Sequence, residues 1–421
     1  MQASPHRING ISPFQATFPM IGSIMGAGVL NLPTSVEKSG YLLSGPILLT
    51  IAAMSAFTLF QLVHCAQKLN KTNPTYFDVC KTAHPLLGYA AEACIGVQGL
   101  GCCLVYFLIL KSWIAKLLGI EGQLEGSFAM NVAFTVGLMI LPMLMAGQKD
   151  LKNLSFASVL GTVSVLYLSV VVMGCGALSI IFGEPGTTEA SQLIKMNTNP
   201  SVVFTAAFEY IFALGCQQNM VRVFSMLEEQ TVMNGVKVGV GAVSVATIVF
   251  FLVSNGGYIA GGNGQNTSIL DILEDKSRPF YGMVAEKFGD KFFYLITLAK
   301  VGMIIVLFAG YSLQMHPARD SILTFLRIPF KKQVDRNLRR VEVLTTTAVS
   351  VIICLCGIDP VPYKYVMNLI AVTASCYIMY LLPSISYLAS TKKTSLFTFI
   401  SLAILASSLA ISGIGLYRIL G

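Results

Sequence analysis

Long apolar runs separated by short polar loops organise this 421-residue sequence. A helix that crosses a membrane needs about 20 mostly apolar residues, and the runs therefore predict an all-α, polytopic membrane protein with about 11 transmembrane helices. The predicted helices cover residues 14–38, 41–66, 86–113, 128–147, 152–182, 201–226, 233–260, 291–315, 340–358, 363–389 and 395–418.

The composition excludes a water-soluble protein of this length. Charged residues make up 11% of the chain and hydrophobic residues 54%, whereas a soluble globular protein carries about 25% charged residues. The net charge of +8 indicates membrane topology rather than nucleic-acid binding, because no basic stripe with interleaved aromatic residues accompanies it.

Lysine and arginine set the expected orientation, since they gather in the cytoplasmic loops of membrane proteins. With a cytoplasmic N-terminus, 17 of them lie in inner segments and 10 in outer segments. The largest inner cluster covers residues 327–340, which we interpret as a topological anchor, with binding of anionic lipid as the alternative. The C-terminus is then outside or lumenal, and Asn266 is a glycosylation acceptor in an outer loop.

The cysteines and histidines form no chemical site in the sequence. Most of the 10 cysteines lie inside apolar runs and are typical of small buried hydrophobic residues. The sequence contains no CxxC pair, and its four histidines are scattered. We find no arrangement of residues for nucleophilic or metal catalysis. We therefore expect no enzyme, no metal and no cofactor, and a monomer that contacts lipid but no nucleic acid.

Small residues interrupt the first predicted helix. Gly26, Ala27 and Gly28 lie in the middle of the apolar segment, between Gly22 and Pro33. Glycine forms helix poorly, and its missing side chain lets a ligand approach the backbone. A helix broken at mid-membrane turns free N–H groups toward an anionic group such as a carboxylate. Close packing against another helix is the alternative reading.

The helix predicted over 201–226 is interrupted in a similar way. Gly215 is followed by a cysteine and then by Gln217, Gln218 and Asn219. Three amide side chains at this depth need hydrogen-bond partners. Two interrupted helices in one chain favour a secondary transporter over simple packing.

The two interruptions correspond if the chain is an inverted repeat of five plus five helices with broken helices 1 and 6. This interpretation predicts one repeat over 14–182, a second over 201–389 and an extra C-terminal helix over 395–418. All of them belong to one transporter domain over 14–420. Residues 1–13 are expected to form a short cytoplasmic tail, without a cleaved signal peptide.

Three motifs resemble the amino acid/auxin permease family, which includes vacuolar and neutral amino acid transporters. They are Gly26-Ala-Gly-Val-Leu-Asn-Leu-Pro33, Gly215-Cys-Gln-Gln-Asn219 and Tyr311-Ser-Leu-Gln-Met-His-Pro-Ala-Arg-Asp-Ser-Ile322. They are similar to the family's first-, sixth- and eighth-helix signatures. The resemblance implies a leucine-transporter-like fold and the transport of amino acids.

The sequence departs from the sodium-coupled members of that family. Those proteins carry an asparagine early in the first helix and a hydroxyl residue late in the eighth. The corresponding positions here are Gly22 and either Phe308 or Gly310, which offer no side-chain oxygen to a hard cation. Ser23 and Ser312 lie one or two positions away. The sequence favours sodium independence, and a proton is the other coupling ion considered.

The substrate site is expected at the two interruptions, with no acidic residue at either break. The ammonium group would then be held by carbonyl groups at the ends of half-helices. Gln217 stands where the family motif has a histidine, which removes one titrating group. We expect the carboxylate at Ser23, Met25, Gly26, Ala27, Gly28 and Val29, the amino group at Ala213, Gly215, Cys216 and Gln217, and the substrate side chain near Gly101 and Tyr106.

Two charges lie at membrane depth in the predicted helices, at Glu209 and Lys300, and Glu92 lies nearer the inner end of the third helix, where we expect it to face water. Such residues are unfavourable in lipid and are functional hypotheses by default. Glu209 and Lys300 each lie about nine residues, or roughly 13 Å, from the outer end of their helix. We predict that they meet in a buried ion pair. The pair either fixes two helices or acts as a coupling or gating element in which Glu209 is protonated during the cycle.

Two functions from different classes fit these features. One is a secondary active or facilitative amino acid transporter that works by alternating access. The other is an amino acid sensor of the same fold. Transport is preferred because the predicted inner segments are too short for a signalling domain, and sodium-coupled neutral amino acid transport is a further alternative. No sorting signal is readable, so plasma, vacuolar and lysosomal membranes stay open.

Overall fold

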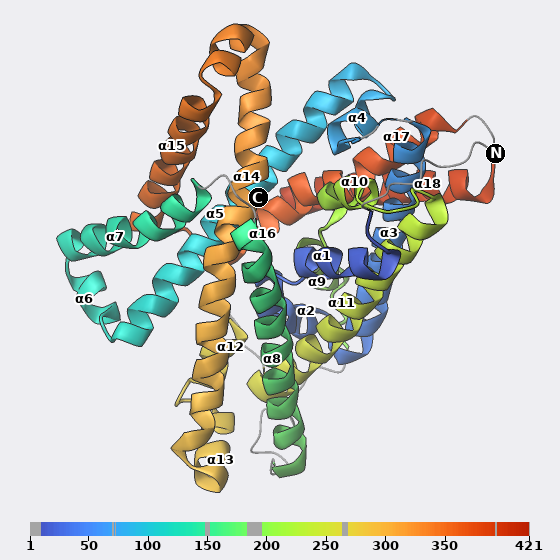
Figure 1. Cartoon of the computed structure of the whole chain (residues 1–421). Coiled ribbons are helices and arrows are strands. Elements are labelled where there is room, and N and C mark those ends of the chain that lie inside the picture. The colour runs from blue at the N-terminus through green and yellow to red at the C-terminus, as the bar shows by residue number, and fades with distance from the viewer. Residues whose placement is uncertain are drawn as a thin grey trace.

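The computed structural model of the chain describes residues 10–69, 71, 73–147, 152–182, 196–262, 268–391 and 394–420. Throughout these residues the secondary structure is helical, apart from one isolated bridge between Ile11 and Leu227. Figure 1 shows helices that cross one another at many angles. The predicted all-α fold class is confirmed.

Nine helices of the described chain are long and apolar enough to cross a membrane, and one bent pair of helices makes a tenth. The chain is therefore a multi-pass membrane protein, while the count of eleven spans, the repeat and the orientation stay predictions. Below, "outer" and "inner" refer to the predicted orientation. The nine are α3 (Tyr41–Lys68), α5 (Pro85–Leu118), α7 (Phe128–Ala146), α8 (Lys152–Phe182), α11 (Val232–Gly261), α14 (Phe293–Arg336), α15 (Leu338–Ile358), the run from α16 (Tyr363–Ile370) through the π-helical η4 (Ala371–Ser375) and η5 (Tyr377–Leu381) to α17 (Leu382–Ser390), and α18 (Leu396–Leu420).

The first predicted helix is broken where its glycines lie. It begins with a capping box between Ser12 and Gln15. Its last α-helical hydrogen bond runs from the N–H of Met25 to the carbonyl of Ile21, and the N–H of Gly26 donates to the carbonyl of Ile24 instead. The two halves differ in direction by 54°. The pieces are α1 (Pro13–Ile24), the 3-10 helix η1 (Ala27–Asn31) and α2 (Leu32–Ser39).

The helix predicted over 201–226 is also two short helices. Asn199 caps the first of them, and Pro200 occupies its first position, where a missing N–H has no consequence. The two helices are α9 (Pro200–Ala213) and α10 (Gln217–Ser225). Both interruptions predicted from the sequence are therefore present.

The broken helices lie in the middle of the molecule. Figure 1 shows α1, α2 and α9 at the centre, with α3 and α11 along one side and α5 crossing α14 on the other. α2 packs on α9, α11 packs on α1 and α3, and α14 packs on α5 and α8. The interruptions are thus enclosed by unbroken helices.

The eighth predicted helix is much longer than expected. Helix α14 contains 44 residues, or about 66 Å at the helical rise, which exceeds the thickness of a bilayer. Its inner part includes Pro317 and Pro329 and kinks at Phe330, which has φ −123° and ψ 33°. The basic segment that we predicted as an inner loop is therefore mostly helical and turns back into α15, as Figure 1 shows.

Short helices that the sequence analysis did not predict lie between the spans. Ser268 caps one of them through the backbone N–H of Asp271, and Thr75 forms a capping box with Asp78 in another. The four short helices are α4 (Tyr76–Lys81), α6 (Glu121–Gly126), α12 (Ile269–Leu273) and α13 (Pro279–Phe288).

Candidate functional site

The two helix breaks are in direct contact. A Cβ atom built on Gly28 would lie 2.8 Å from Cα and 3.0 Å from Cβ of Ala213, which is closer than real Cβ atoms approach. Glycine is therefore required at this position by the approach of the α9 backbone. The interruption of the first helix and the end of α9 form one structural unit.

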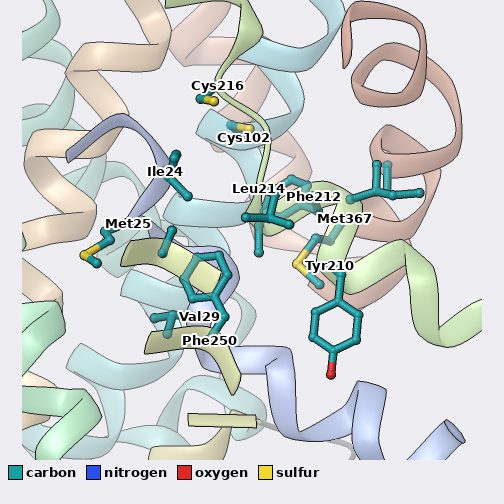
Figure 2. Close-up of a cluster of buried hydrophobic side chains, with 14 of the residues drawn as sticks. Ile24, Met25, Val29, Cys102, Tyr210, Phe212, Leu214, Cys216, Phe250 and Met367 are labelled. Atoms are coloured by element: carbon teal, nitrogen blue, oxygen red, sulfur yellow. The ribbon is translucent and has the colours of Figure 1, made fainter. Parts of the chain in front are cut away.

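Side chains from five regions surround this unit. Figure 2 shows Ile24, Met25 and Val29 from the first break near Phe212, Leu214 and Cys216 from the second, with Cys102 of α5, Phe250 of α11 and Met367 of α16 beside them. All of these side chains are buried. These side chains form an apolar part of the surroundings of the two breaks.

Two helix N-termini start at the breaks. Gly26 precedes η1 and Cys216 precedes α10, and neither position provides a side-chain cap hydrogen bond. The first N–H groups of a helix have no partner within the helix, and the positive end of the helix dipole favours an anion. Both N-termini are thus suited to a carboxylate.

Gln217 contacts α3 rather than an open site. Its Nε2 donates to Ser55 Oγ at 2.8 Å and to Thr58 Oγ1 at 3.3 Å, and its Oε1 accepts from the backbone N–H of Cys216 at 3.0 Å. The side chain is completely buried. In this structure Gln217 holds the second break in place and has its hydrogen bonds within the protein.

Ser23 and Asn219 join the two broken helices on the inner side of the breaks. Asn219 Nδ2 donates to Ser23 Oγ at 2.6 Å. Ser23, predicted as a substrate residue, is therefore engaged with α10. Asn219 was quoted in the sequence motif but was not among the expected site residues.

The two expected residues of α5 lie in different surroundings. Tyr106 is brought to the first break, since a Cβ built on Gly26 would lie 3.3 Å from its hydroxyl oxygen. Gly101 instead faces α16, where a built Cβ would lie 2.2 Å from Cδ1 of Ile370. Gly101 is a close-packing position, while Tyr106 is positioned to contact a bound molecule.

Gln98 is a site residue that the sequence analysis missed. Its side chain is 5% exposed, and its Oε1 has no hydrogen-bond partner among the described residues. Its Nε2 would lie 3.5 Å from a Cβ on Gly215, so the amide lies beside the second break. Gln98, Cys102 and Tyr106 are spaced four residues apart, and this spacing on one helix face could have revealed it.

The predicted ion pair between Glu209 and Lys300 is wrong. Lys38 Nζ contacts Glu209 Oε1 at 2.5 Å, and Lys300 pairs with Asp271, at 3.2 Å, and with Glu274. The actual partners all lie outside the two helices predicted over 201–226 and 291–315. Lys38 lies in the last turn of α2, which packs on α9, and α12 folds back onto α14.

A buried charge network fastens α12 to α5 and α14. Asp271 accepts from Trp113 Nε1 at 3.0 Å and from Ser268 Oγ at 2.7 Å, and Lys116 lies 3.3 Å away. Burial by itself would raise the pKa of Asp271, but the charges of Lys300 and Lys116 and these hydrogen bonds outweigh it and lower the pKa. The carboxylate therefore stays ionised.

Replacing Asp271 by asparagine should lower stability by about 2 kcal/mol, because a charged acceptor with several partners is lost. Because folding lowers the pKa of Asp271, its contribution is fully present above its ordinary pKa of about 4 and disappears only as the pH falls through the lowered value. Thermal unfolding in detergent should show the same deficit at pH 7 and pH 5.

The matched control for this prediction is Asp275→Asn, which changes an exposed carboxylate near the same helix. It should change the unfolding midpoint little. A deficit of Asp271→Asn that already vanishes at pH 5 would contradict the network.

Polar contacts also join η1 and α2 to α16 at the outer side of the breaks. Tyr363 Oη donates to Asn31 Oδ1 at 3.0 Å, and Lys364 Nζ donates to Thr34 Oγ1 at 2.9 Å. With the Lys38–Glu209 pair, they connect three helices near the breaks. In this structure the outer ends of these helices are held together.

The structure places hydroxyl groups near the positions that we compared with the sodium site of the family. A Cβ on Gly22 would lie 3.5 Å from Thr162 Oγ1 of α8, and Ser312 Oγ is buried without a partner in the described part of the chain. No group of three or more His, Cys, Asp or Glu residues within the described ranges could hold a metal. Sodium independence stays a prediction.

Comparison with known proteins gives a family match. A family model described as "Transmembrane amino acid transporter protein" matches residues 9–420. The chain is similar to vacuolar amino acid transporter 5 of Schizosaccharomyces pombe (22% identity, 75% of this chain, 70% of the relative) and to vacuolar amino acid transporter 7 of Saccharomyces cerevisiae (24%, 60% and 50%). It is also similar to sodium-coupled neutral amino acid transporter 7 of Xenopus laevis (26%, 62% and 58%). The matches thus span between 50% and 70% of the length of these relatives.

Proposed function

The chain belongs to the transmembrane amino acid transporter family, and on that premise we propose that it moves amino acids across a membrane by alternating access. The observation that supports this most is the contact between the two helix breaks at Gly28 and Ala213. Broken helices that meet in the middle of a transporter are a common place for substrate and ion binding. The apolar surroundings of the breaks make backbone groups available in a water-poor site.

The proposed binding mode uses both halves of each broken helix. The substrate carboxylate lies at the N-termini of η1 and α10, where the helix dipole is positive. The ammonium group lies at the carbonyl ends of α1 and α9, near Met25 and Leu214. The substrate side chain extends toward Tyr106 and Gln98, whose free amide oxygen accepts a hydrogen bond from a polar substrate or from water.

The proposed cycle opens the outer side by separating α2 from α9 and α16. The contacts that must break are the Lys38–Glu209 pair, the bond of Tyr363 to Asn31 of η1 and the bond of Lys364 to Thr34 of α2. A substrate shifts this equilibrium only through contacts that differ between the two states. Residues of the two breaks face each other, and their contacts with the substrate would differ between the two states of the cycle.

We propose that the cycle is independent of sodium and that Glu209 is the candidate proton carrier. Glu209 is 2% exposed, and its Oε2 has no partner among the described residues, so protonation would give this oxygen a hydrogen to donate. The alternative, sodium coupling, is supported by the name of one group of relatives and by the hydroxyl groups near Gly22.

The test is uptake of a panel of labelled amino acids into proteoliposomes, with pH and sodium varied independently. We expect saturable uptake that is unchanged when choline replaces sodium and that responds to an imposed pH gradient if the cycle carries a proton. A large loss in choline would show sodium coupling. Absence of uptake and of exchange under every gradient would exclude the transporter.

A further inference from the structure

A cavity lies far from the helix breaks. It has a volume of about 440 Å³ and opens between α4, α5 and α14 at the predicted inner side. Glu92 in its wall is fourteen residues from Tyr106 on α5, or about 20 Å at the helical rise. The lining residues are Thr75, Phe77, Tyr89, Glu92, Thr324, Arg327 and Ile328.

The cavity contains one negative and one positive side chain that are bonded to other residues and not to each other. Glu92 Oε2 accepts from Ser321 Oγ at 2.9 Å. Arg327 Nε donates to Asp335 Oδ1 at 3.0 Å, and both Nη groups stay available for a further acceptor. Ser321 and Arg327 are six residues apart on α14, or about 9 Å. A ligand that satisfies both needs an ammonium group and an anionic group separated by several bonds.

Exposed apolar side chains lie in the wall of the cavity and beside it. Ile328 is 62% exposed and Tyr89 is 37% exposed in the wall, and Phe325 packs on Tyr89 with ring centroids 6.3 Å apart. They belong to α5 and to the inner part of α14. Because α14 is longer than a bilayer is thick, its inner part extends past the hydrocarbon core on the predicted inner side. The cavity therefore lies at the level of the lipid headgroups.

We propose that this cavity binds the phosphoethanolamine headgroup of a membrane phospholipid. The primary ammonium donates to Glu92, and the phosphate accepts from the guanidinium of Arg327, as in charge-assisted recognition of headgroups between helices. The apolar part of the lipid next to the headgroup packs on Ile328 and Phe325.

Ethanolamine fits this cavity better than choline or glycerol. A trimethylammonium group has no N–H for Glu92, and its usual binder is an aromatic cage. Phe77 and Tyr89 instead pack edge to face on each other with centroids 5.5 Å apart. A glycerol headgroup would leave Glu92 near a phosphate without a compensating cation.

The experiment compares dioleoyl phospholipids that differ only in headgroup. Purified full-length protein in detergent is titrated with phosphatidylethanolamine, phosphatidylcholine or phosphatidylglycerol, and the thermal unfolding midpoint is measured. We expect phosphatidylethanolamine to give the largest rise. Glu92→Gln and Arg327→Gln should each weaken its half-saturation about tenfold, because each removes a charge-assisted bond. Lys332→Gln, an exposed charge on the same helix outside the cavity, should leave it unchanged.

Further measurements distinguish a phospholipid from a free headgroup as the ligand. Soluble phosphoethanolamine that reproduces the full effect would support the same site with a free headgroup as its ligand. If Glu92→Gln does not fold, Ser321→Ala provides the test, because it removes the bond that orients Glu92. An equal effect of phosphatidylcholine, a stronger effect of phosphatidylglycerol, or an ethanolamine effect that survives these substitutions would overturn the proposal.

Discussion

Gly28→Ala should reduce amino acid uptake by about 100-fold. The added Cβ would meet the backbone of Ala213 at 2.8 Å, and backbone cannot move aside as the end of a side chain can. The two breaks would separate by a fraction of an ångström or more, and misplacement of about 1 Å in a binding site can cost about 100-fold. Uptake into proteoliposomes, normalised to the amount of folded protein, measures the effect.

Two glycines provide graded controls for this experiment. A Cβ on Gly26 would meet the hydroxyl of Tyr106 at 3.3 Å, and that side chain can yield, so Gly26→Ala should reduce uptake about tenfold. A Cβ on Gly174 of α8 would meet nothing within 4 Å, and Gly174→Ala should transport like the wild type. Normal uptake by Gly28→Ala would show that the contact between the breaks is unimportant for transport.

The helix breaks were predictable because their cause is local. Gly26 and Gly28 weaken the helix by their own backbone preferences, and the apolar runs show which segments span the membrane. The same reasoning located Gly215 and the second break. Sequence patterns of this kind require no knowledge of which helices become neighbours.

The partners of the buried charges were not predictable, because they depend on tertiary packing. Lys38 ends the helix predicted over 14–38 without an expected partner, and α12, which carries Asp271, was not expected at all. Lys111 lies near the end of the helix predicted over 86–113, and α5 continues to Leu118. There its ammonium is buried and donates to Asn131 Oδ1 and to the carbonyl of Gly357. Helix length and charge counts say nothing about such contacts.

Gln98 could not be assigned to the candidate site from the sequence, for a different reason. Its spacing from Tyr106 places both side chains on one face of α5, but every long helix has several such faces. Only the structure shows that this face meets the second break and that Oε1 of Gln98 is unpartnered among the described residues. The identity of neighbouring helices therefore decides which polar residue belongs to the site.

Lys38→Met should lower the stability of the protein by about 3 kcal/mol. The substitution keeps the volume of the side chain but leaves the carboxylate of Glu209, which is 2% exposed, without the cation in direct contact with it, while Lys364 still acts on it from further away. Breaking a buried pair from one side costs about 3–5 kcal/mol, and the lower end applies because Lys38 is 23% exposed. Thermal unfolding in detergent measures the change.

Two further variants separate the unpaired charge from other effects of the substitution. Lys71 forms a more exposed pair with Asp78, so Lys71→Met should cost less than about 1 kcal/mol. Adding Glu209→Gln to Lys38→Met removes the unpaired carboxylate and should restore most of the lost stability. If the double variant is as unstable as Lys38→Met, the loss comes from packing at α2. A third measurement is the response of uptake to pH in Glu209→Gln alone. If this response is abolished while the protein stays folded, Glu209 carries the proton. The same carboxylate then explains both the stability of the α2–α9 contact and the pH response.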